Sequence, residues 1–225
     1  MSSTAATGFR EASRELGITG SIEKAALAWL AARVPARIGS DHLTALGFAA
    51  TLAAAVLYGA SAAHPWLVLL VNVALLVNWY GDSLDGTLAR FRGCSRPRYG
   101  FYVDHLVDSV GAAALVLGLV ASGLMAPIVG GALVVAYLLL SIEMFLSTYT
   151  LGRFKIAHGG FGGTELRIAL ALLNVAVYAW PGPLPFGLRL FDVAGVAAAV
   201  VLTGAFTVAA VRNSIRLRDE ETPPA

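Results

Sequence analysis

Charged residues are scarce in this chain of 225 residues, and cysteine is nearly absent. Asp, Glu, Lys and Arg make up 13% of the residues, about half of the roughly 25% usual in a soluble domain. The single cysteine, Cys94, excludes an internal disulfide and a cysteine-based metal site. A net charge of +2, with no basic face interleaved with aromatics, argues against nucleic-acid binding. A soluble globular domain, a disordered chain and a disulfide scaffold are therefore excluded.

Apolar sequence is abundant instead, and four long stretches carry no Asp, Glu, Lys or Arg. These stretches are residues 42–81, 109–142, 168–188 and 193–211. A membrane-spanning helix needs about 20 mostly apolar residues, so each of the two longer stretches contains parts of two spans. The pattern predicts an all-α, polytopic membrane protein with six transmembrane helices. The predicted spans are Leu43–Ala62, Trp66–Tyr80, Phe101–Leu124, Pro127–Tyr149, Thr164–Trp180 and Phe191–Val211.

A shorter amphipathic segment precedes the first predicted span. Its apolar residues recur at helical spacing on one side: Ile22, Ala26, Trp29, Leu30 and Val34. Lys24 and Arg33 lie toward the other side, which is typical of a helix lying in the membrane interface; a short soluble amphipathic helix fits equally well. We expect three regions: residues 1–38 as a cytoplasmic or interfacial segment, 39–213 as the membrane domain, and 214–225 as a cytoplasmic tail.

Basic residues indicate how the chain is oriented. Cytoplasmic loops of membrane proteins carry an excess of Lys and Arg. With six spans, fifteen of the sixteen basic residues fall on one side, and only Arg189 falls on the other. We therefore expect a multi-pass protein of the cell (cytoplasmic or inner) membrane with both termini in the cytoplasm.

Four aspartates gather around the turn between the second and third predicted spans. Asp82 and Asp85 are three residues apart at the end of the second span, and Asp104 and Asp108 are four apart at the start of the third. Both spacings put the two members of a pair on one helix face. An antiparallel helical hairpin that turns near residues 92–97 brings both pairs to the same depth. The sequence therefore predicts four carboxylates converging at the cytoplasmic face.

Divalent cations explain such a cluster. An Asp within a span costs about 2.5–3.5 kcal/mol at the bilayer centre and less near the interface, and like charges repel. Hard oxygen ligands favour Mg²⁺, Mn²⁺ or Ca²⁺, and four Asp suffice for two ions that clamp a phosphoryl group. The alternative is that the Asp side chains pair with nearby arginines at a helix end.

Small residues and one arginine accompany the aspartates. Gly86 and Ala89 follow Asp85, and Gly100 precedes Asp104 by one turn. Residues without bulky side chains let a ligand or a facing backbone approach closely, although small residues also pack membrane helices together. Arg90 offers a fixed positive charge that can hold a phosphate.

The pattern Asp82-x-x-Asp85-Gly86-x-x-Ala89-Arg90, followed by Gly100-x-x-x-Asp104-x-x-x-Asp108, resembles the signature of the CDP-alcohol phosphotransferases (CDP-alcohol phosphatidyltransferases). All eight signature residues are present in order. Nine residues separate Arg90 from Gly100, one more than the usual pattern has. The extra residue falls in the predicted turn, where loops tolerate insertions.

The resemblance implies a reaction and a role for each signature residue. Asp82, Asp85 and Asp104 would bind Mg²⁺ or Mn²⁺, most simply two ions, and Asp108 would complete the metal site and act as general base. The nucleotide pocket would be lined by Gly86, Ala89, Arg90 and Gly100. In the family reaction an acceptor alcohol attacks a phosphorus of a CDP-alcohol and CMP leaves. The implied partners are a CDP-alcohol donor (CDP-diacylglycerol or a soluble CDP-alcohol), an acceptor alcohol and membrane lipid; family members are commonly homodimers.

Further polar residues suggest where the acceptor binds. Glu143 lies inside the fourth predicted span, where a charged residue indicates function by default. We expect an acceptor pocket beside the Asp cluster, formed by Glu143, Ser147, Arg153, Lys155, Glu165 and Arg167. The alternative is that Glu143 pairs with Arg167 or Arg153 and joins the fourth and fifth spans. His105 lies between two signature Asp residues but off their face, so its role stays open.

Two other functions fit an acidic membrane protein less well. An intramembrane prenyltransferase also binds Mg²⁺-pyrophosphate through Asp-rich motifs, but it carries them in separate halves of a longer bundle. A divalent-metal transporter would carry carboxylates at mid-membrane depth and on both sides, whereas only Asp192 lies on the far side here.

Overall fold

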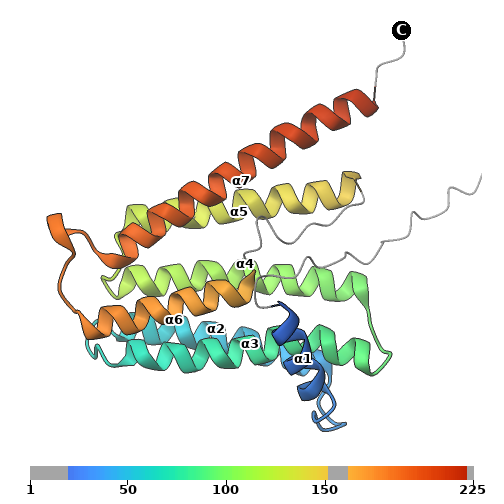
Figure 1. Cartoon of the computed structure of the whole chain (residues 1–225), viewed down its shortest axis with the longest axis horizontal. Coiled ribbons are helices and arrows are strands. Elements are labelled where there is room, and N and C mark those ends of the chain that lie inside the picture. The colour runs from blue at the N-terminus through green and yellow to red at the C-terminus, as the bar shows by residue number, and fades with distance from the viewer. Residues whose placement is uncertain (1–19, 152–161, 222–225) are drawn as a thin grey trace, which may run out of the picture.

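The computed structural model describes residues 20–151 and 162–221 of the chain. This part of the chain is helical and has no strand, which confirms the predicted all-α class. Figure 1 shows long helices that run roughly along one axis, with a short N-terminal helix crossing them at one end. The helices are α1 (Gly20–Ala31), α2 (Ser40–Ala60), α3 (Leu67–Phe91), α4 (Pro97–Ala121), α5 (Pro127–Leu151), α6 (Gly163–Ala179) and α7 (Leu190–Glu220).

Five of these helices, α2, α3, α4, α5 and α7, are long and apolar enough to cross a membrane. They support the predicted multi-pass membrane protein. Helix α6 has 17 residues and carries Glu165 and Arg167 near its start, so it falls short of the roughly 20 apolar residues of a full span. The count of six spans, the interfacial location of α1 and the cytoplasmic location of both termini stay predictions.

Two helices extend beyond the predicted spans. Helix α3 runs past the span end at Tyr80 to Phe91, so Asp82 and Asp85 lie within the helix, in agreement with the predicted turn near residues 92–97. Leu84 and Leu88 give this polar stretch a buried apolar face against α1, which keeps it helical. Helix α7 continues through the predicted tail to Glu220, where Arg216 Nε and Glu220 Oε1 form an ion pair one turn apart at 2.7 Å.

Helix α2 holds the two helices of the signature in place. The principal helix contacts of the described chain join α2 to α3 and α2 to α4, and none of them joins α3 to α4. A Cβ on Gly81 of α3 would lie 2.5 Å from the Gly47 nitrogen of α2, and a Cβ on Gly118 of α4 would collide with the Ala55 carbonyl oxygen. Helices α3 and α4 are joined by a short turn, as the sequence predicts, but the glycine contacts place both of them on α2 rather than on each other.

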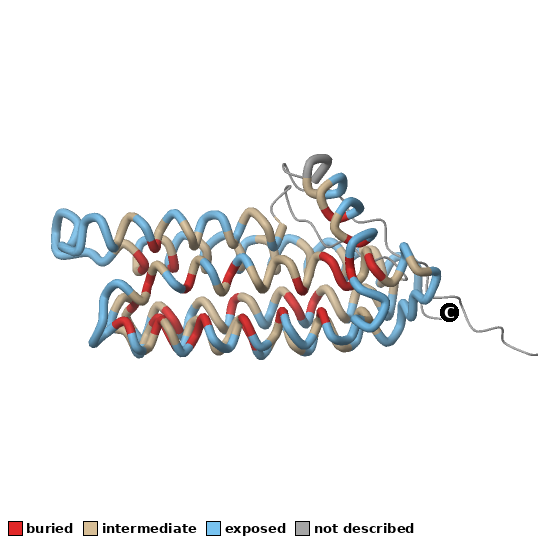
Figure 2. Tube along the Cα trace, turned by 90° about the horizontal axis from the view of Figure 1, so that it is seen from below, coloured by how far each residue is buried: buried red, intermediate tan, exposed pale blue. Residues whose placement is uncertain are grey.

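The remaining long helices form a second group. Helices α5 and α7 lie side by side, apart from α2 and α3 (Figure 1). Asp192 on α7 accepts a hydrogen bond from the Ala126 amide at the start of α5 (2.6 Å). Buried positions run along the tightly packed helices (Figure 2), whereas only Phe191 and Gly195 are buried on α7. An apolar helix with so little buried surface suits contact with lipid.

A buried polar network links the helices around the site. The Tyr58 hydroxyl of α2 donates to Asn174 Oδ1 of α6 at 2.9 Å, and Asn174 Nδ2 donates to Asn72 Oδ1 of α3 at 2.7 Å. Tyr58 and Asn174 are fully buried. Side chains that hydrogen-bond between membrane helices hold them in register, so this network fixes α6 against α2 and α3.

Helix α1 packs on α3 through Leu27 and Ala31, but Trp29 is 57% exposed and stacks under the Arg33 guanidinium (3.6 Å from the ring centroid). The prediction that Trp29 and Val34 share one helix face is therefore wrong. Helix α1 ends at Ala31, and Val34 reaches the core through the turn that follows.

We expect Gly81→Ala to destabilise the protein, because the new methyl group would meet the backbone of α2, which cannot rotate away. Overpacking of this kind costs about 1–3 kcal/mol. Thermal unfolding in detergent measures the change. Gly131→Ala is the matched control, because a Cβ at Gly131 meets no atom within 4 Å; equal melting temperatures for the two variants would contradict the packing.

Candidate active site

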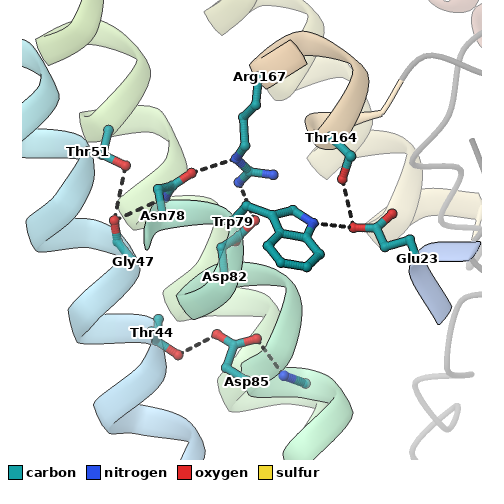
Figure 3. A network of polar contacts seen from close by, with 11 residues as sticks. Glu23, Thr44, Gly47, Thr51, Asn78, Trp79, Asp82, Asp85, Thr164 and Arg167 are labelled. Carbon is teal, nitrogen blue, oxygen red and sulfur yellow. Dashed lines mark hydrogen bonds and ion pairs between the residues drawn. The ribbon is translucent and has the colours of Figure 1, made fainter. Parts of the chain in front are cut away.

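Asp85 is the most deeply buried carboxylate of the cluster, with 4% of its surface exposed. Thr44 of α2 donates its hydroxyl to Asp85 Oδ2 at 2.6 Å, and the Gly86 amide donates to Oδ1 (Figure 3). Hydrogen bonds that orient a carboxylate in this way are typical of the outer partners of metal ligands. Asp85 is therefore held in one orientation by α2 and by its own helix.

Asp82 is joined to α6 by an ion pair. Arg167 Nη2 lies 2.5 Å from Asp82 Oδ2, and both side chains are largely buried. Arg167 Nε also donates to Asn78 Oδ1 at 2.6 Å, and Asn78 Nδ2 donates to the Gly47 carbonyl at 3.0 Å (Figure 3). This chain of contacts runs from α6 through α3 to α2, so three helices fix the position of Asp82.

The other two aspartates come from α4. Asp108 lies within electrostatic range of Asp82, Asp85, Asp104 and Arg167. The structure therefore brings together the four carboxylates that the sequence placed in one cluster. Asp108 is exposed and Asp104 is half-buried, which leaves the α4 side of the cluster open to a ligand.

The four carboxylates have the chemistry that a divalent ion prefers, but in this structure they lie too far apart to bind one ion together. Carboxylate oxygens are hard ligands of the kind that Mg²⁺ and Mn²⁺ prefer. Among the described residues, no three Asp, Glu, His or Cys side chains are close enough to hold one ion as they stand. Arg167 supplies positive charge to Asp82 in this arrangement. A bound ion would have to draw the carboxylates closer together.

Two signature residues predicted to line the nucleotide pocket differ in their surroundings. A Cβ added to Gly100 would meet no atom within 4 Å, whereas one added to Gly86 would lie 3.4 Å from Arg90 Nη1. Packing among the described residues therefore gives no reason for a glycine at position 100, and its part in a nucleotide pocket stays a prediction. Arg90 is exposed and donates to Thr87 Oγ1 at 3.3 Å; Ala89 is half-buried.

The predicted acceptor residues do not all lie together. Arg167 is beside Asp82, but Glu143 is buried on α5, where it accepts a hydrogen bond from Asn213 of α7 at 2.6 Å. The alternative ion pair between Glu143 and Arg167 is therefore wrong, since each has another partner. Ser147 Oγ donates to the Met144 carbonyl (3.0 Å), and Glu165 accepts from the Gly162 amide (2.9 Å) at the start of α6.

Arg153 and Lys155 lie outside the described residues, so their part in an acceptor pocket stays a prediction. The ring of His105 stacks on Phe101, with 4.2 Å between ring centroids, and meets the edge of Phe145. It contributes to an aromatic cluster between α4 and α5.

Sequence reasoning missed three polar residues that position the cluster: Thr44, Asn78 and Glu23. Asn78 lies four residues before Asp82 on the same helix face, so helical spacing alone would have found it. The hydrogen bond from Thr44 of α2 to Asp85 of α3 could not be predicted, because it depends on the register between the two helices. Glu23 of α1 contacts α3 and α6.

We expect Thr44→Val to weaken the binding of Mn²⁺ by about tenfold, because Asp85 loses the hydroxyl that orients it. The increase in melting temperature on titration with Mn²⁺ measures the affinity. Thr207→Val is the matched control, since the exposed Thr207 hydroxyl bonds the Thr203 carbonyl within α7. Equal affinities for the two variants would contradict an orienting role for Thr44.

Comparison with known families places these residues in context. A family model described as CDP-alcohol phosphatidyltransferase matches residues 38–211, which include α2 to α6, most of α7 and all eight signature residues. No curated protein matches the chain. Since the match covers well over half of the sequence, the chain belongs to the CDP-alcohol phosphatidyltransferase family.

Proposed function

We propose that the protein is an integral-membrane phosphotransferase of phospholipid biosynthesis. It would move a phosphatidyl or phospho-alcohol group from a CDP-alcohol to an acceptor hydroxyl and release CMP. The observation that carries the proposal is that Asp82, Asp85 and Asp104 all lie within electrostatic range of Asp108, on two helices that the family match contains. The apolar helices around the cluster support a reaction at a membrane.

The carboxylates have distinct tasks in this proposal. Asp82, Asp85 and Asp104, completed by Asp108, would hold Mg²⁺ or Mn²⁺. When bound, the metal would neutralise the pyrophosphate and the charge that develops on the departing CMP. Thr44 keeps Asp85 oriented, and Arg167 keeps Asp82 in place.

Asp108 is the proposed general base. Its side chain is exposed, so an acceptor alcohol can reach it. The acceptor oxygen forms a bond to the donor phosphorus, the bond from that phosphorus to the CMP oxygen breaks, and the acceptor proton passes to the Asp108 carboxylate.

The nucleotide side of the site rests on the small residues and Arg90. Gly86, Ala89 and Gly100 would let the donor approach the backbone of α3 and α4. Arg90, exposed on the last turn of α3, offers a guanidinium to a donor phosphate. A polar nucleotide would enter from the cytoplasm while an acyl chain of the donor or acceptor stays in the bilayer.

We expect Asp108→Asn to reduce CMP release by at least a hundredfold, because the amide cannot accept the acceptor proton. General bases typically contribute a factor of 10²–10⁴. CMP release by the purified protein in lipid measures the effect, and the melting temperature checks the fold. Asp219→Asn, at an exposed ion pair with Arg218 on α7, is the control. Full activity in Asp108→Asn would reject the assigned base.

Removal of divalent metal should stop turnover and its return should restore it. The experiment incubates the protein with EDTA, adds back Mg²⁺ or Mn²⁺, and follows CMP release from CDP-diacylglycerol and from soluble CDP-alcohols with a panel of acceptors. The productive donor and acceptor identify the substrate. Release of CMP without metal would contradict the metal site, and prenyl transfer or metal uptake without CMP release would contradict the proposed function.

A further inference from the structure

We propose that Glu23 of the N-terminal helix is a positioning residue for the ion pair between Arg167 and Asp82. Helix α1 would then be part of the framework of the active site, although it precedes the residues that match the family. Only the expected changes in kcat and KM rest on the proposed function.

One carboxylate oxygen of Glu23 joins three helices. Glu23 Oε1 accepts a hydrogen bond from Trp79 Nε1 of α3 at 2.8 Å and another from Thr164 Oγ1 of α6 at 2.7 Å (Figure 3). Charged acceptors make stronger hydrogen bonds than neutral ones. Glu23 therefore connects α3 and α6 directly, in addition to attaching α1 to both.

The positions of the two donors relate this contact to the active site. Trp79 precedes Asp82 by three residues on α3, and Thr164 precedes Arg167 by three residues on α6. Residues three apart on a helix are neighbours on one face. The contact through Glu23 and the ion pair between Arg167 and Asp82 thus join the same two helices, and each donor to Glu23 lies one turn along its own helix from a member of the pair, so each contact constrains the geometry of the other.

Helix α6 depends on such a contact at its first turn. Thr164 and Glu165 lie in this turn, and Glu165 is engaged with the Gly162 amide of its own helix. The hydrogen bond from Thr164 to Glu23 and the contacts of Arg167 link this end of α6 to α1 and α3. Farther along, Asn174 makes the next polar link.

Electrostatics and packing favour a carboxylate at this position. Glu23 lies at the N-terminal turn of α6, where the helix dipole stabilises negative charge. Leu27 and Ala31 already attach α1 to α3 through apolar contacts with Leu84 and Leu88. The hydrogen bonds of Glu23 are therefore not needed to hold α1 on α3, and their specific effect is on the position of α6.

The test compares Glu23→Ala with Glu23→Gln in the full-length protein. The glutamine keeps an oxygen that can accept both hydrogen bonds, whereas the alanine keeps none. We expect Glu23→Ala to weaken Mn²⁺ binding about tenfold and to lower kcat more than it raises KM for the CDP-alcohol, with Glu23→Gln within twofold of wild type in each quantity. Glu220→Ala, at an exposed ion pair on α7, is the control for loss of a surface carboxylate.

Hydrogen exchange gives a readout that needs neither metal nor turnover. Amides of residues 166–170, the first in α6 with an intrahelical acceptor, should exchange faster in Glu23→Ala and at the wild-type rate in Glu23→Gln. Thr164→Val removes one of the two bonds and keeps the side-chain shape, so it carries the test if Glu23→Ala does not fold. Adding Thr164→Val to Glu23→Ala should cause no further loss, because both changes break the same contact.

Three results would overturn the proposal. The first is wild-type Mn²⁺ affinity, kcat and amide exchange in Glu23→Ala, and the second is an equal loss of Mn²⁺ affinity and kcat in Glu23→Gln and Glu23→Ala. The third is a double variant in which the losses caused by Glu23→Ala and Thr164→Val multiply. Failure of the proposed function has a different signature. In that case the wild-type protein releases no CMP from any donor, while the exchange and Mn²⁺ comparisons still report on Glu23.

Discussion

The structure depends on keeping carboxylates within long apolar helices, where an uncompensated charge is costly. Asp82 meets this constraint through Arg167, and the pair is largely buried between α3 and α6. Asp85 meets it through hydrogen bonds from Thr44 and the Gly86 amide. The partners come from α2, α3 and α6, so the contacts that compensate the charges also fix the positions of these helices. The same interactions therefore orient the carboxylates and hold the bundle together.

Close backbone contacts make this arrangement possible. Glycines at the α2–α3 and α2–α4 contacts let both signature helices pack on α2 rather than on each other. Overlap of a methyl group with a backbone atom cannot be relieved by a side-chain rotation, so the spacing is rigid. Helix α7, which buries only Phe191 and Gly195, pairs with α5 apart from α2 and α3. The described bundle therefore combines a tightly packed part that carries the carboxylates with a more loosely attached pair.

Much of the site could be predicted from the sequence, because helical spacing decides which residues of one helix share a face. The pairs Asp82–Asp85 and Asp104–Asp108 follow from that spacing, and so does the convergence of the two pairs once a turn is placed between them. Contacts between helices could not be predicted in the same way. The contact of Thr44 with Asp85 and those of Glu23 with Trp79 and Thr164 depend on the register of α2 and α1 against α3, which is set by side-chain shape over the whole contact. The predicted apolar span stops at Tyr80 because charge marks where an apolar run ends, whereas the helix continues to Phe91 with Leu84 and Leu88 buried on one face.

The turn between α3 and α4 has one further consequence. It contains Cys94, which is the only cysteine of the chain and is exposed, next to Gly93 in the left-handed conformation (φ 64°). A spin label or fluorophore coupled to this thiol would occupy a single known position between the two halves of the signature without prior removal of other cysteines. The natural sequence thus provides its own spectroscopic reporter for how the two carboxylate-bearing helices move relative to the surrounding lipid.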